Sequence, residues 1–323
     1  MLYQSFNIRR SARFYYDRLN DDQRRAYNAL KKCIEEYGRS TKVSVSKGCS
    51  VDDFDRIGFF VMLDNPLLYY LDYTSCSMYR MADHNELSIG CHYSYSKIEV
   101  ENNLLRITEK VEDIYYTLFR SLKDDYEKEK RFHDYLIENV FYHLKPVEKR
   151  KNEFNVIGPL FSGYGVCMGF AQVVNLVMNS VGVKCTTICG DSKNTEDDTG
   201  HAWNLIRIDK NYYHLDVTWD YVDVRGSLRY DYFNLTDDMC RKDHTWDTET
   251  GCLSDKDNYH VRNNLCARSV SDVHRIIRDT DGSLISVRFM SDRMTPEKAL
   301  RSVVANCRYR FNSDQRVLTI EMV

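Results

Sequence analysis

The middle of the sequence constrains the fold more than any other part. The glycine-rich run GYGVCMG at 163–169 leads into an apolar segment over 170–180 that is typical of a buried helix. Strands are expected over 183–189, 201–208 and 212–219, because these segments are rich in β-branched and aromatic residues. A helix followed by strands, the last two joined by a tight turn, is therefore expected at the centre of the chain.

The cysteine in the glycine-rich run has a setting that favours nucleophilic chemistry. Cys167 follows Gly163 and Gly165 and stands where the predicted helix begins. The positive end of a helix dipole favours a thiolate, and free backbone N–H groups at that end can bind an oxyanion. Since most cysteines are simply buried, this setting alone favours a structural role. A catalytic role needs a base nearby.

The predicted hairpin offers a base and a group to orient it. His201 starts the first strand, and Asp216 lies in the second, apolar one. If Asp209-Lys210 is a two-residue turn, His201 faces Thr218, and Asp216 is its diagonal neighbour on the same face. A three-residue loop would put the two side chains on opposite faces. A cysteine nucleophile needs such a base, and the base needs a third group that holds its tautomer.

The three segments GYGVCMGFA, GHAWNLIRI and YYHLDVTWD, in this order, resemble the core of the transglutaminase-like superfamily in its bacterial branch. The resemblance is close over 158–220 and looser over 133–143 and 230–238. It implies an α+β, papain-like core in which a helix bearing the cysteine packs on an antiparallel sheet bearing the histidine and the aspartate.

The resemblance also implies a catalytic triad of Cys167, His201 and Asp216. The expected enzyme is a thiol protease, amidase or acyltransferase that attacks peptide or amide bonds through a thioester. Hydrolysis is favoured over crosslinking, because water is always present and no amine site is recognisable. The alternatives are a non-catalytic binding or scaffold protein with this fold, and acyl transfer of the arylamine N-acetyltransferase type.

Aromatic residues near the predicted triad have two interpretations. Tyr164 and Trp203 are expected to line a substrate channel, although packing in the core is as reasonable for both. For Trp219, packing is favoured.

Length and element pattern predict three units. A chain of 323 residues exceeds what one hydrophobic core usually organises. We expect an N-terminal α+β domain over 1–122, the catalytic core over 123–264 and a small C-terminal α/β domain over 265–323. In the first domain, strands are expected over 69–81 and 87–100.

Composition limits which partners and which cellular compartment are expected for this protein. The net charge of −3 gives no field for nucleic acid or anionic membranes, so a protein or peptide substrate is expected. The eleven scattered cysteines form no Cys-x-x-Cys pair and are expected to be reduced in a cytoplasmic protein. No calcium-loop or zinc spacing occurs, so we expect no metal and no cofactor. No signal peptide is expected at the N-terminus.

Overall fold

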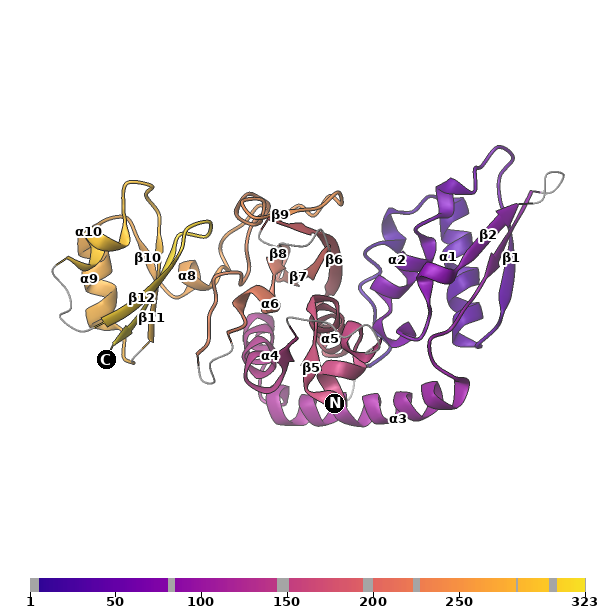
Figure 1. The fold of residues 1–323 in the computed structure, drawn as a ribbon, viewed down its shortest axis with the longest axis horizontal. Helices are drawn as coiled ribbons and strands as arrows, with labels where there is room; N and C mark the ends of the chain where they lie inside the picture. Colours follow the sequence, from indigo (N-terminus) through magenta and orange to yellow (C-terminus); the bar gives the residue numbers. More distant parts are fainter. Residues whose placement is uncertain are drawn as a thin grey trace.

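The computed structural model describes residues 6–80, 85–143, 151–193, 200–222, 227–282, 284–301 and 307–322. Three parts lie in a row, with the N-terminal sheet at one end, the C-terminal sheet at the other and α5 and β6–β8 between them (Figure 1). Among the helices of these residues, none has the length and apolar character needed to cross a membrane.

The helices are α1 (Asp21–Glu35), α2 (Ile57–Asp64), α3 (Lys97–Ile114), α4 (Asp125–Asn139), α5 (Cys167–Ser180), α6 (Val217–Asp220), α7 (Asp237–Cys240), α8 (Tyr259–Arg262), α9 (Val270–Asp279) and α10 (Pro296–Leu300). The strands are β1 (Ser40–Ser44), β2 (Ser77–Arg80), β3 (Glu86–Gly90), β4 (Phe141–Tyr142), β5 (Tyr164–Gly165), β6 (Cys185–Ser192), β7 (His201–Ile208), β8 (Asn211–Leu215), β9 (His244–Thr245), β10 (Cys266–Ala267), β11 (Leu284–Phe289), β12 (Cys307–Asn312) and β13 (Val317–Met322).

The N-terminal part is an antiparallel sheet in the order β1-β3-β2, with α1 packed against β1. Helix α2 packs on α1 and on β6 of the central part. The strand expected over 87–100 is wrong beyond Gly90. Helix α3 begins at Lys97, because Ser96 and Glu99 form a capping box that satisfies backbone N–H groups at its start. Likewise, the strand expected over 69–81 is formed only from Ser77, and its last residue lies outside the described residues.

The central part has the expected papain-like arrangement. Helix α5 packs on β6 and β7 of an antiparallel sheet in the order β8-β7-β6-β9. Leu205 pairs with His214 and Ile208 with Asn211, so the two-residue turn at Asp209-Lys210 is confirmed. The second strand of the hairpin ends at Leu215, earlier than expected, because Asp216 caps the short helix α6.

The C-terminal part is a sheet in the order β10-β11-β13-β12, covered by α9 and α10. Its apolar residues form a cluster of their own, whereas one continuous cluster joins the N-terminal part to the central part. Thr295 caps α10 and Pro296 opens it. The domain boundaries stay a prediction.

Candidate active site

Cys167 is the first residue of α5, at the helix end where backbone N–H groups lack intrahelical partners. Two glycines allow the backbone on either side of Cys167 to turn and to pack closely. Gly163 has a φ of +70°, which a side chain would strain, and a Cβ on Gly169 would lie 2.2 Å from the Glu153 carbonyl oxygen. The rest of α5 is buried from Gly169 onward, while Cys167 stays partly exposed. The thiol is therefore held rigidly and within reach of a ligand.

His201 and Asp216 are in direct contact. The ring Nε2 of His201 lies 2.6 Å from Oδ2 of Asp216, and both side chains are buried. The side chain of Cys167 also interacts with His201 and contributes to raising its pKa. Because Nε2 is engaged by the carboxylate, Nδ1 is the nitrogen that faces the thiol. The structure thus brings the three predicted residues together in the order cysteine, histidine, aspartate.

Electrostatics favour a charged imidazole in this position. Burial alone would lower the pKa of His201, but the charge of Asp216, its hydrogen bond and the hydrogen bond to Cys167 raise that pKa to about 10. Burial opposes ionisation of Asp216 too, yet the charge and hydrogen bond of His201 hold its pKa well below the usual range. Both shifts favour an imidazolium at His201 and a carboxylate at Asp216.

Asp216 is also fixed by its own helix. Its Oδ1 accepts hydrogen bonds from the backbone N–H groups of Thr218 and Trp219, at 3.0 and 3.1 Å. This N-cap leaves Oδ2 free to face His201. The capping role and the orienting role are therefore carried by different oxygens of one carboxylate.

The three aromatic residues near the predicted triad differ in their exposure. Trp203 is 1% exposed, which favours the packing interpretation over a place in a substrate channel. Its ring stacks against His201 at 5.7 Å, and its N–H donates to Nδ1 of His214 at 2.9 Å, which makes it a buried support for the base. Tyr164 is 41% exposed, and its channel role stays a prediction. Trp219 is half-buried and lies 5.9 Å from the His201 ring.

Sequence reasoning missed two residues that contact the triad. Tyr142 lies on β4, which pairs with β5 just before Cys167, and the backbone N–H of Cys167 acts on its hydroxyl, where it lowers the pKa. Burial raises the pKa of Tyr142, so its hydroxyl keeps a proton to donate. His244, on β9, places Nε2 at 3.1 Å from Oδ2 of Asp216. Only Tyr142 lies in a stretch that the resemblance covers.

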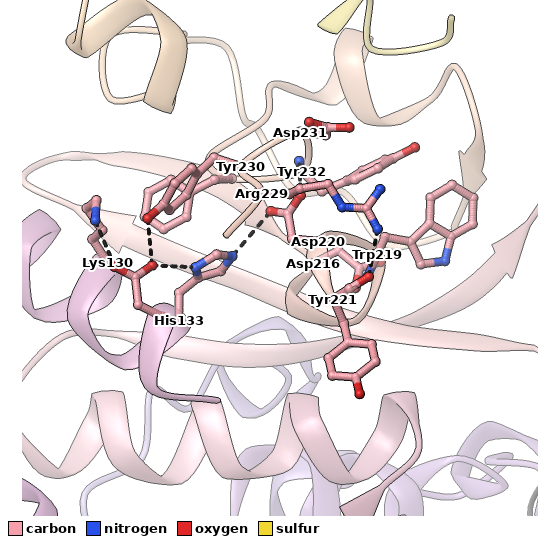
Figure 2. A network of polar contacts seen from close by, with 12 residues as sticks. Lys130, His133, Asp216, Trp219, Asp220, Tyr221, Arg229, Tyr230, Asp231 and Tyr232 are labelled. Carbon is pink, nitrogen blue, oxygen red and sulfur yellow. Dashed lines mark hydrogen bonds and ion pairs between the residues drawn. The ribbon is translucent and has the colours of Figure 1, made fainter. Parts of the chain in front are cut away.

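A buried ionic network anchors the helix that Asp216 caps (Figure 2). His133 of α4 lies 3.0 Å from Asp134 and 3.3 Å from Asp220, the last residue of α6. Lys130 bonds the far side of Asp134 at 2.7 Å. Burial opposes a charge on His133, but its two carboxylate neighbours raise its pKa to about 9. Helix α4 thereby ties down the turn that carries the triad aspartate.

Two groups among the described residues combine enough metal-ligating atoms to be tested as cation sites. They are His201, Asp216 and His244, and His214, Asp237 and Cys252. Two ligands of one tetrahedral zinc ion lie about 3.3 Å apart, given metal–ligand bonds of about 2.0 Å. The 2.6 Å contact of His201 with Asp216 and the 2.8 Å contact of His214 with Asp237 are shorter and fit hydrogen bonds. Neither group fits a metal.

The fold and the site define a papain-like α+β protein with a cysteine–histidine–aspartate constellation. Residues 112–217 match the family model described as transglutaminase-like superfamily. Over these residues, about a third of the chain, the central part is therefore similar to the transglutaminase-like superfamily. A comparison with curated proteins finds no match.

Three solved structures are similar over parts of the chain. A TGase is 14% identical over 48% of this chain and 45% of its own, with a TM-score of 0.33. A protein of Cytophaga hutchinsonii, described as a candidate cysteine protease, is 13% identical over 45% of this chain and 61% of its own, with a TM-score of 0.29. A candidate protease of Parabacteroides distasonis is 12% identical over 44% and 35%, with a TM-score of 0.27. The chain spans less than two thirds of each.

Proposed function

We propose that this protein is a cysteine hydrolase that cleaves peptide or amide bonds through a thioester at Cys167. The observation that carries the proposal is the position of His201, which contacts Asp216 at 2.6 Å and has its pKa raised by both Asp216 and Cys167. An imidazolium held in this way can keep its neighbour as a thiolate and still supply a proton to a leaving group.

The first half-reaction uses the resting ion pair. The Cys167 thiolate attacks the carbonyl carbon, and the carbonyl oxygen becomes an oxyanion. His201 then gives its Nδ1 proton to the amine nitrogen as the C–N bond breaks, which leaves the thioester and a free amine. Asp216 keeps the imidazole in the required tautomer throughout.

The oxyanion has two donors in this geometry. One is the backbone N–H of Cys167, which acts on the hydroxyl of Tyr142. The other is that hydroxyl itself, which can turn its proton toward the oxyanion when substrate enters.

The second half-reaction consumes water. Neutral His201 takes a proton from a water molecule, the resulting hydroxide attacks the thioester carbon, and the C–S bond breaks to give a carboxylic acid. The proton on His201 and the thiolate on Cys167 are then restored. An amine in place of water would give transamidation by the same steps.

Labelling with iodoacetamide at low concentration tests the proposal. Wild-type protein should be alkylated first at Cys167, and Cys167→Ala should lose this labelling. Cys189→Ser is the matched control, because burial raises the pKa of Cys189 to about 12 and its thiol should not compete. Faster labelling of another cysteine in the wild type would contradict the proposal.

Analysis of the products shows whether water or an amine is the acyl acceptor. Incubation with a peptide library, with and without a fluorescent primary amine, should yield shortened peptides ending in new carboxylates. Incorporation of the amine without hydrolysis would overturn the preference for water. A reactive Cys167 that turns over no peptide or amide would instead favour a non-catalytic binding role.

A further inference from the structure

His244 is a second histidine on the carboxylate of the proposed triad. Its Nε2 lies 3.1 Å from Oδ2 of Asp216, and its Nδ1 lies 2.6 Å from Oδ1 of Asp243. The His244 side chain is fully buried. Carboxylates only accept hydrogen bonds, so both ring nitrogens must carry a proton, and the ring is then a cation.

The second carboxylate is held by the C-terminal part. Oδ2 of Asp243 accepts hydrogen bonds from the Tyr232 hydroxyl at 2.8 Å and from the Gln315 amide at 3.1 Å. Gln315 lies in the turn between β12 and β13. These donors stabilise the Asp243 charge, and that charge in turn stabilises the His244 imidazolium.

A glycine makes the approach of His244 possible. Strand β9 pairs with the end of β6, and a Cβ on Gly190 would lie 2.0 Å from the Thr245 carbonyl oxygen. Any side chain at Gly190 would push β9 outward and take His244 away from Asp216. The close packing of β9 is therefore built into the backbone.

We propose that His244 is a positioning residue, a permanent buried cation that holds Asp216 in place and shares its charge with His201. This inference rests on the proposed function of Cys167. His201 and His244 have ring centroids 5.4 Å apart and donate to the same oxygen of Asp216. The His244 cation therefore weakens the hold of Asp216 on the His201 proton, which makes His201 a better acid toward the leaving group.

The titratable groups around His244 are Asp216 before α6, Asp243 in its own loop, His201 on β7, His214 on β8, Cys240 on α7, and Tyr232. Burial lowers the pKa of His214, and burial raises those of Tyr232 and Cys240, so these three are neutral. The charges that His244 meets are Asp216, Asp243 and His201. The two carboxylates together raise the pKa of His244 despite its burial.

Removing a cation makes nearby protons harder to lose, and this predicts a pH shift. His244→Gln keeps an amide donor toward Asp216 but carries no charge. The pH midpoint for alkylation of Cys167 by iodoacetamide should rise by at least about 0.5 unit, given the effective dielectric constant of about 20 usual for such sites. A merely structural role would lower the rate without moving the midpoint.

His214→Gln is the matched control, because His214 is an equally buried but neutral histidine next to Trp203. Its midpoint should equal that of the wild type. A shift of the same size in both variants, or no shift in His244→Gln while wild-type Cys167 reacts rapidly, would overturn the inference and leave the proposed function standing. A wild-type Cys167 that does not react rapidly contradicts the proposed function.

Nitrogen-15 spectra of the histidine rings in the wild-type protein give a test that needs no variant to fold. At pH 7.5, His244 should show two protonated ring nitrogens and the shifts of an imidazolium. A neutral ring with a single N–H at this pH would overturn the inference, whatever the reactivity of Cys167.

Discussion

Replacing Asp216 by asparagine changes one oxygen of the proposed triad into an amide. The amide oxygen of Asp216→Asn would still cap α6, because Oδ1 of Asp216 accepts from two backbone N–H groups there. The new NH2 group then faces Nε2 of His201, where the carboxylate oxygen was. Two donors cannot share one hydrogen bond, so the imidazole must present a lone pair at Nε2 and carry its proton on Nδ1. The imidazolium beside Cys167 is thereby lost.

The expected change in the alkylation rate follows from the charge that Asp216 stabilises on His201. His201 has its pKa raised from 6.5 to about 10, which corresponds to about 5 kcal/mol of stabilisation of the imidazolium. A neighbouring imidazolium favours the thiolate form of a cysteine, which is the form that reacts. An unassisted thiol with a pKa of about 8.5 is only about 3% ionised at pH 7. The variant should therefore be alkylated about 30-fold more slowly.

The assay is the rate of iodoacetamide alkylation of the Cys167 peptide, followed by mass spectrometry between pH 6 and pH 9.5. The difference should nearly vanish at pH 9.5, where an unassisted thiol is mostly ionised. Asp209→Asn is the control, since Asp209 lies in the hairpin turn at a φ of 54°, which asparagine tolerates. Equal rates at pH 7, or a ratio that does not depend on pH, would refute the reasoning.

Two further predictions use other contacts of the site. Tyr142→Phe removes one proposed oxyanion donor and should lower kcat for peptide hydrolysis by about 10²–10³-fold at nearly constant KM, while Cys167 alkylation keeps its wild-type rate; a change in KM alone would argue against an oxyanion role. His133→Gln removes an imidazolium whose pKa is raised to about 9 by Asp134 and Asp220. A raised histidine pKa stabilises the fold fully below pH 6.5, and this contribution is lost as the pH rises through 9. In urea unfolding, the free energy of unfolding of the wild type should therefore exceed that of His133→Gln by about 3 kcal/mol at pH 6 and by much less at pH 10. A difference that stays constant with pH would show that His133 acts through packing alone.

The sequence determined the local parts of the site. Alternation with a period of two and a two-residue turn sufficed to place His201 and Asp216 on one face, and the observed pairing of Leu205 with His214 has that register. The glycine-led helix start at Cys167 is equally local, because backbone sterics and capping act within a few residues. The prediction failed where two local signals competed. The residues over 91–100 favour a strand by composition, and a strand was expected there, but the capping box at Ser96 starts a helix instead.

Only the tertiary structure decided which side chains surround the proposed triad. Tyr142 reaches the Cys167 N–H through the pairing of β4 with β5, and His244 reaches Asp216 through the pairing of β9 with β6. The burial of Trp203 follows from packing between His201, His214 and the end of the sheet. No periodicity records such contacts, because they join segments far apart in the chain and depend on how whole elements pack. The sequence thus determined the proposed nucleophile, the proposed base and the hairpin, whereas the fold decided the charges around them.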